Sequence, residues 1–141
     1  MCAQDLKILS KLKIFHIVNC KGASGVNYHE SNKNFTYIRF EISSWFSYPN
    51  VKTAEGVLRF FEKTHSFIDK ALAQGHNVMV HCLAGAHRAG TTGVSYVMKA
   101  ADLNFREALK ITQMRRPIVQ PIGGFDELLR HLEAAYKVYG R

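Results

Sequence analysis

The apolar residues of the chain follow two spacings, one typical of strands and one typical of helices. Short runs rich in β-branched and aromatic residues predict strands at residues 14–18, 35–42 and 78–80. Apolar residues that recur three or four positions apart predict helices at residues 3–13, 53–74, 89–101, 104 to just before 117, and 124–139. Strands that alternate with helices indicate an α/β layered domain.

The same spacing predicts which side chains face the core. In the helices, these residues are Leu6, Leu9 and Leu12, then Val57, Phe61, Ile68 and Leu72, and finally Phe125, Leu128, Leu132, Tyr136 and Tyr139. In the strand at 35–42, Ile38, Phe40 and Ile42 alternate with Tyr37, Arg39 and Glu41. One face of this strand is therefore expected to be apolar, with Glu41 pointing away from it.

Length and composition set the class of protein. The chain has 141 residues, 47% of them hydrophobic, which suits one ordinary domain with its own core. Its formal net charge of +8 favours anionic partners. The three cysteines, Cys2, Cys20 and Cys82, form neither a disulfide framework nor a zinc pattern. Without a signal-peptide segment or a membrane span, we expect an intracellular, cytoplasmic protein.

The most informative segment is residues 78–91, which reads VMVHCLAGAHRAGT. A strand leads to Cys82, a short loop follows, and a helix begins at about Arg88. The main-chain N–H groups of such a loop can point inward, and the helix N-terminus adds a partial positive charge. The Arg88 guanidinium can bind two phosphate oxygens at once. The segment therefore predicts a phosphate-binding cradle, with Gly85 at its tightest turn.

The cradle would place Cys82 against a bound phosphate. A thiol at a helix N-terminus and near a cation is readily held as a thiolate, which is a nucleophile. The expected chemistry is attack on phosphorus, a phosphocysteine intermediate and its hydrolysis. Arg88 and the N–H groups of the loop would stabilise the transferring phosphoryl group. The substrate-binding residues would be Leu83, Ala84, Gly85, Ala86, His87 and Arg88.

This pattern resembles the His-Cys-x5-Arg signature of the cysteine-dependent protein tyrosine phosphatase superfamily, and in particular of small, atypical dual-specificity phosphatases. The resemblance extends through residues 3–19, 37–40 and 116–125. It implies a pocket for phosphotyrosine and for phosphoserine or phosphothreonine, with no metal and no cofactor. It also implies that His81 orients the loop and helps to hold the thiolate. His87 would line the rim of the pocket or be merely solvated.

The fold that we expect is a single α/β domain spanning residues 1–141, with a small mixed β-sheet and helices on both faces. The site would lie at the carboxyl end of the strand that precedes Cys82. Relatives have completed an edge strand before the point that matches the start of this chain. We therefore expect that strand to be either missing or outside the given sequence.

The sequence departs from the family at both positions that handle protons. Ser44 occupies the place of the usual Asp general acid, and no carboxylate follows it before Glu55. Ala89 occupies the place of the usual Ser or Thr after the arginine, although Thr91 and Thr92 lie one turn later. General acid catalysis typically contributes 10²–10⁴-fold. We therefore expect slow hydrolysis, above all for poor leaving groups.

Three functions compete. The first is a slow protein phosphatase acting on phosphorylated proteins, which the presence of Cys82 favours. The second is a pseudophosphatase that only binds a phosphorylated partner. The third is an RNA 5′-triphosphatase, which the charge of +8 suits but which lacks an RNA-binding stripe of aromatic and basic residues. We expect a monomer that binds no metal and no membrane.

Several other residues have two interpretations. Arg115 and Arg116 end a helix, and we favour interaction with the helix dipole over a second anion site. The aromatic residues Trp45, Phe46 and Tyr48 either cover the site or pack in the core. Cys2 and Cys20 are expected to be free thiols, and a disulfide between Cys20 and an oxidised Cys82 is the less favoured reading.

Overall fold

The computed structural model describes residues 2–23 and 25–141, without the side chain of Cys2. The elements are η1 (Cys2–Gln4), α1 (Leu6–Lys11), β1 (Ile14–Asn19), β2 (Thr36–Arg39), η2 (Ile42–Ser47), α2 (Ala54–Ala73), β3 (Asn77–His81), α3 (Arg88–Ala100), α4 (Phe105–Arg115) and α5 (Phe125–Tyr139). Each strand and α-helix predicted from the sequence is present. The short 3₁₀-helix η2 was not predicted.

The sheet has three strands in the order β2-β1-β3, and β1 pairs in parallel with both neighbours. The expected mixed sheet is thus wrong for the described residues. The reason lies in the connections, because a tight hairpin is what joins antiparallel neighbours. Residues 20–35 cross from β1 to β2 as a long loop, and α2 crosses from β2 to β3.

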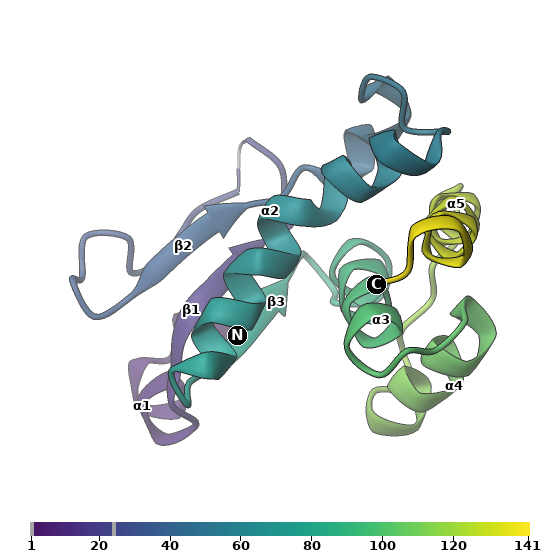
Figure 1. Cartoon of the computed structure of the whole chain (residues 1–141). Helices are drawn as coiled ribbons and strands as arrows, with labels where there is room; N and C mark the ends of the chain where they lie inside the picture. The colour runs from purple at the N-terminus through teal and green to yellow at the C-terminus, as the bar shows by residue number, and fades with distance from the viewer. Residues whose placement is uncertain (1, 24) are drawn as a thin grey trace.

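Helices cover both faces of the sheet, as expected (Figure 1). On one face, Leu9 of α1 packs with Ile17 of β1 in a small cluster. On the other face, Val18 belongs to the main core together with Val57 and Phe61 of α2. Neighbouring residues of β1 thus enter opposite cores, because successive side chains of a strand point to opposite faces.

Capping residues fix where the helices begin. The Thr53 hydroxyl accepts a hydrogen bond from the Gly56 N–H (3.1 Å) at the start of α2. Before α4, the Asn104 side chain accepts from the Glu107 N–H (2.9 Å) and Glu107 accepts from the Asn104 N–H (3.1 Å). This reciprocal pair is a capping box, which fixes the first turn of α4.

Four of the side chains assigned to the core are exposed: Leu6, Leu12, Leu72 and Tyr139. All four lie within one turn of a helix end or just beyond it. Periodicity identifies the apolar face of a helix but not how far its neighbour extends along that face. At these ends, no second element among the described residues covers the predicted face.

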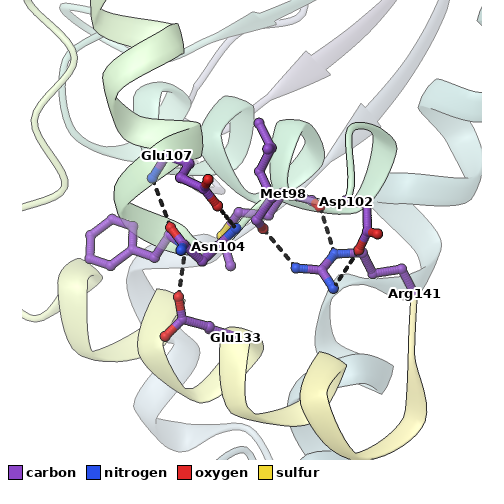
Figure 2. Close-up of polar contacts among 8 residues, drawn as sticks. Met98, Asp102, Asn104, Glu107, Glu133 and Arg141 are labelled. Carbon is purple, nitrogen blue, oxygen red and sulfur yellow. Dashed lines mark hydrogen bonds and ion pairs between the residues drawn. The ribbon is translucent and has the colours of Figure 1, made fainter.

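The last residue of the chain fastens the turn between α3 and α4 (Figure 2). The Arg141 guanidinium donates to the Met98 carbonyl (2.8 Å) and forms an ion pair with Asp102 (2.9 Å). It also lies over the ring of Tyr136, 4.7 Å from the ring centroid. The end of α5 is thereby held against the end of α3.

A buried histidine makes the stability of the fold depend on pH. His65 of α2 stacks on Phe61, with ring centroids 5.2 Å apart, and its Nε2 lies 2.9 Å from the Ser95 hydroxyl. Burial, reinforced by the charge of Lys99, lowers the pKa of His65 to about 4. In the unfolded chain the pKa of a histidine is about 6.5. Between pH 4 and pH 6.5, residue 65 is therefore mostly protonated in the unfolded chain and mostly neutral in the folded chain.

We expect this site to contribute stability that is complete above pH 6.5 and is lost as the pH falls towards 4. From pH 7 to pH 5, the free energy of unfolding should decrease by about 2 kcal/mol through His65. Urea denaturation of the native chain and of His65→Phe at both pH values measures this contribution. An equal decrease in the two chains would show that His65 is not its source.

Candidate active site

The site lies where β3 ends and α3 begins. His81 is the last residue of β3 and Arg88 the first residue of α3, so residues 82–87 form the connecting loop. The His81 carbonyl accepts a hydrogen bond from the Cys20 N–H (2.8 Å), which fixes the end of β3 to the end of β1. The carboxyl end of a sheet next to a helix N-terminus is a common place for anion binding.

The loop curls around the Cys82 sulfur. Cys82 is buried, with 5% of its surface exposed. Its Sγ receives the N–H of Gly85 (3.3 Å) and the N–H of Ala89 (3.4 Å). Gly85 has φ +75°, a conformation that residues with a Cβ rarely adopt. Both donors, together with the partial positive charge of the helix N-terminus, stabilise negative charge on the sulfur.

Arg88 is half-buried at the start of α3. In the described part of the chain, no carboxylate lies within 4.0 Å of its guanidinium, so no ion pair neutralises it. Burial raises the pKa of the neighbouring Cys20, and the charge of Arg88 lowers it in part. The structure therefore places the charge of Arg88 near Cys20, and its position beside Cys82 stays a prediction.

A second guanidinium lies against the loop, and the sequence did not predict its position. A Cβ built on Gly85 would lie 3.1 Å from Nη2 of Arg116. The structure shows that Arg116, the residue after α4, contacts the loop between β3 and α3. Its interaction with the helix dipole and its use as a second anion site both stay predictions. Only a contact between distant segments brings these two residues together, so the sequence carried no local signal for it.

The segment that follows Arg116 braces the loop. The Gln120 N–H donates to the Ala86 carbonyl (2.8 Å). The Gln120 carbonyl lies 2.8 Å from Nδ1 of His87. The exposed His87 ring thus contacts the segment after α4. Neither interpretation from the sequence, a ring at the rim of the pocket or a solvated ring, includes this contact. Leu83 and Ala84 are exposed, and Gly85 and Ala86 are half-buried.

The His81 ring is buried beside the site. Burial, and then the charge of Lys21, lower the pKa of His81, so the ring is neutral at neutral pH. Neither ring nitrogen has a hydrogen-bond partner among the described residues. The hydrogen bond that connects His81 to β1 is therefore made by its main-chain carbonyl, which accepts from the Cys20 N–H. The role that the resemblance implies for the ring stays a prediction.

Cys20 lies beside the site in a buried position. Its Sγ is 3.5 Å from the Thr92 hydroxyl, which donates to the Arg88 carbonyl (2.9 Å). Burial raises the pKa of Cys20 to about 12. Little of this thiol is ionised at neutral pH, so it is a poor nucleophile towards an oxidised Cys82. The Thr92 hydroxyl is itself engaged, and Thr91 is fully buried.

The segment after β2 holds no carboxylate where the family has its acid. Ser44 lies in η2 and is exposed, as is Glu41 before it. Trp45 is buried in the main core, next to the ring of His131 at 6.3 Å between centroids. The sequence left open whether these aromatic residues pack in the core or cover the site. Trp45 packs in the core, whereas Phe46 is 68% exposed and does not. Ser44 thus stands in an open segment anchored by Trp45.

The described residues contain neither a metal-binding cluster nor a membrane-spanning helix. No group of three His, Cys, Asp or Glu residues within residues 2–23 and 25–141 is placed to hold a metal ion. No described helix has the length and apolar character needed to cross a membrane.

Known proteins resemble this chain along most of its length. The sequence model of the dual specificity phosphatase catalytic domain matches residues 1–135. The human serine/threonine/tyrosine-interacting protein is 31% identical over 133 residues, 93% of this chain and 56% of that protein. The human dual specificity protein phosphatase 9 is 31% identical over 137 residues, 97% of this chain and 34% of that protein. This chain thus spans about half, or less, of these relatives.

Solved structures show the same fold. The human tyrosine phosphatase-like serine/threonine/tyrosine-interacting protein superposes with a TM-score of 0.70 at 27% identity. The match covers 94% of this chain and 84% of that one.

Proposed function

Because the chain belongs to the dual specificity phosphatase catalytic domain family, we propose that it is a cysteine-dependent phosphatase of phosphorylated proteins. Its substrates would be phosphotyrosine and phosphoserine or phosphothreonine. The observation that carries the proposal is the position of the Cys82 sulfur, which receives N–H groups from Gly85 and Ala89 inside the loop. A residue that only bound phosphate would not need a thiol at this point.

The reaction would take place in two steps. In the first, the Cys82 thiolate attacks phosphorus, the P–S bond forms, and the bond to the leaving oxygen breaks. In the second, water attacks the phosphocysteine, the P–S bond breaks, and inorganic phosphate leaves with the thiolate restored. Arg88 and the loop N–H groups would hold the equatorial oxygens in both steps. With Ser44 in place of an acid, the leaving oxygen would take its proton from water.

A phospho-binding protein without turnover is the alternative function. Ser44 and Ala89, which replace both proton-handling groups of the family, favour it. One relative at 31% identity is named as an interacting protein rather than as a phosphatase. Both functions use the same cradle, so they differ only in whether the Cys82 sulfur reacts.

Hydrolysis of para-nitrophenyl phosphate by the native chain separates the two functions. We expect slow but measurable turnover, because the nitrophenolate leaving group of this substrate needs little help from an acid. Orthovanadate should inhibit this turnover competitively, because it would occupy the phosphate-binding cradle. Vanadate binding without turnover would support the phospho-binding alternative. Absence of both binding and turnover would contradict both functions.

A further inference from the structure

The loop that follows β1 is held in place by one buried side chain. Asn19, the last residue of β1, is fully buried. Its Nδ2 donates to the Gly25 and Val26 carbonyls (3.4 and 3.3 Å) and to Oδ1 of Asn27 (2.8 Å). Its Oδ1 accepts from the Lys21 N–H (2.9 Å). Each of these bonds would leave a buried polar group unpaired if it broke, so the main chain of Lys21 is fixed relative to β1.

This fixed point lies next to the candidate site. In the pairing of β1 with β3, Asn19 is the partner of His81, and the Cys20 N–H donates to the His81 carbonyl (2.8 Å). The carboxyl ends of the two strands therefore lie side by side (Figure 1). Lys21 follows one of these ends and Cys82 follows the other, so Lys21 lies on the β1 side of the site.

The Lys21 ammonium is oriented by an aromatic ring and has no counter-ion. Its Nζ lies over the ring of Tyr28, 5.9 Å from the centroid, and this ring lies 6.5 Å from the ring of His81. Burial, and then the charge of Lys21, lower the pKa of His81, which shows that this charge acts on the residue before Cys82. Lys21 is half-buried and forms no ion pair within residues 2–23 and 25–141.

We propose that Lys21 and Tyr28 form a subsite that selects phosphorylated proteins with an acidic residue beside the phosphorylated residue. The inference rests on the proposed function, because the phosphate must be held in the cradle for its neighbour to reach Lys21. The carboxylate would supply the counter-ion that Lys21 does not have among the described residues. The cation–π contact with Tyr28 orients the ammonium beforehand, so less side-chain freedom is lost on binding.

A carboxylate fits this subsite better than a second phosphate does. Phosphate groups are typically held by several donors, such as a guanidinium fork. The other cation at this loop, Arg39, already donates through Nη1 to the Gly22 carbonyl. Lys21 alone offers one compact positive charge, which matches one carboxylate. The same charge would repel basic residues beside the phosphate, and charge complementarity of this kind distinguishes one substrate from another.

Binding of two phosphotyrosine peptides tests the proposal. The peptides are acetyl-EE(pY)EE-amide and acetyl-QQ(pY)QQ-amide, and the chain carries Cys82→Ser so that neither is hydrolysed. Isothermal titration calorimetry gives the ratio of the two dissociation constants, and we expect the acidic peptide to bind more tightly. In this chain Lys21→Gln should lower the ratio about threefold and Lys21→Glu about tenfold, as the loss and the reversal of one partly exposed charge imply. Lys21→Arg keeps the charge and should keep the ratio within about twofold.

Lys33 provides the matched control. It is exposed in the same loop but lies just before β2, at the opposite end of the sheet, and Lys33→Gln removes the same charge. This variant should leave the ratio unchanged. Equal decreases for Lys33→Gln and Lys21→Gln would overturn the proposal, because net charge alone would then explain them, and so would an unchanged ratio in Lys21→Gln.

The same measurements distinguish this inference from the proposed function. A chain that bound neither peptide would contradict both of them. A ratio that depends on Lys21, in a protein whose native chain does not hydrolyse para-nitrophenyl phosphate, would support the subsite and contradict the phosphatase activity alone.

Discussion

Replacement of Cys82 by serine is expected to reduce the turnover of para-nitrophenyl phosphate by at least about 10³-fold. The sulfur receives two N–H groups, from Gly85 and Ala89, and these stabilise a thiolate. A serine hydroxyl at the same place keeps its proton near neutral pH, so the nucleophile is lost. The loop and Arg88 stay in place, and binding of inorganic phosphate should therefore change by only a few-fold.

Cys20 provides the matched control for this experiment. It is also buried and lies at the end of the neighbouring strand, but its raised pKa keeps it a thiol. Cys20→Ala should retain turnover within about threefold, because the residue donates no group to the proposed reaction. Turnover of Cys82→Ser within tenfold of the native chain would mean that another group attacks phosphorus. Steady-state kinetics of the three chains distinguishes these results.

Much of the site could be predicted because its signals are local. A β-rich run, a glycine-containing loop and an apolar helical spacing follow one another in residues 78–101, and each element forms where its own residues favour it. The same holds for α4, whose first turn is fixed by the reciprocal contact of Asn104 and Glu107. In such segments, local preference and the fold agree.

The contacts that complete the site could not be predicted in this way. Arg116 meets Gly85, and Gln120 meets Ala86 and His87, across about 30 residues of chain. These pairs depend on how α4 and the segment after it pack against α3. The spacing of apolar residues along the chain does not determine this packing. The number of strands beside β3 is likewise a property of the assembled sheet, since its sequence reads the same at an edge and at the centre.

The assembled site separates binding from proton transfer. The groups that we propose to hold an anion are all present: the loop N–H groups, the helix N-terminus, Arg88 and Arg116. The groups that move protons in the family are absent from their usual positions, where Ser44 and Ala89 stand. A thiolate can still attack phosphorus in such a site, so the rate should depend on how well the leaving group departs unaided.

The identity of the leaving group should therefore control the rate. We expect the native chain to hydrolyse an aryl phosphate at least about 10²-fold faster than an alkyl phosphate such as a phosphoserine peptide, because general acid help is worth about 10²–10⁴-fold for a poor leaving group. Its kcat should show no fall on the alkaline side, since no acid has to stay protonated. Equal rates for the two substrates would contradict the absence of an acid.

Ser44→Asp should restore part of the missing function. Ser44 is exposed in η2, so a carboxyl group there replaces no core packing. We expect kcat for the phosphoserine peptide to rise at least about tenfold and kcat for para-nitrophenyl phosphate to change little, because nitrophenolate leaves without a proton. The new carboxyl must be protonated to act, so kcat for the peptide should now fall as the pH rises through its pKa.

The adjacent Ser43 supplies the matched control, because it is equally exposed and Ser43→Asp adds the same charge one residue away. If both variants raised the rate alike, charge alone would be the cause and the position of the acid would be irrelevant. A rise with Ser44→Asp only, confined to the alkyl substrate and accompanied by the alkaline fall, requires a proton donated at the leaving oxygen. That combination would place residue 44 within reach of the phosphate held by Cys82 and Arg88.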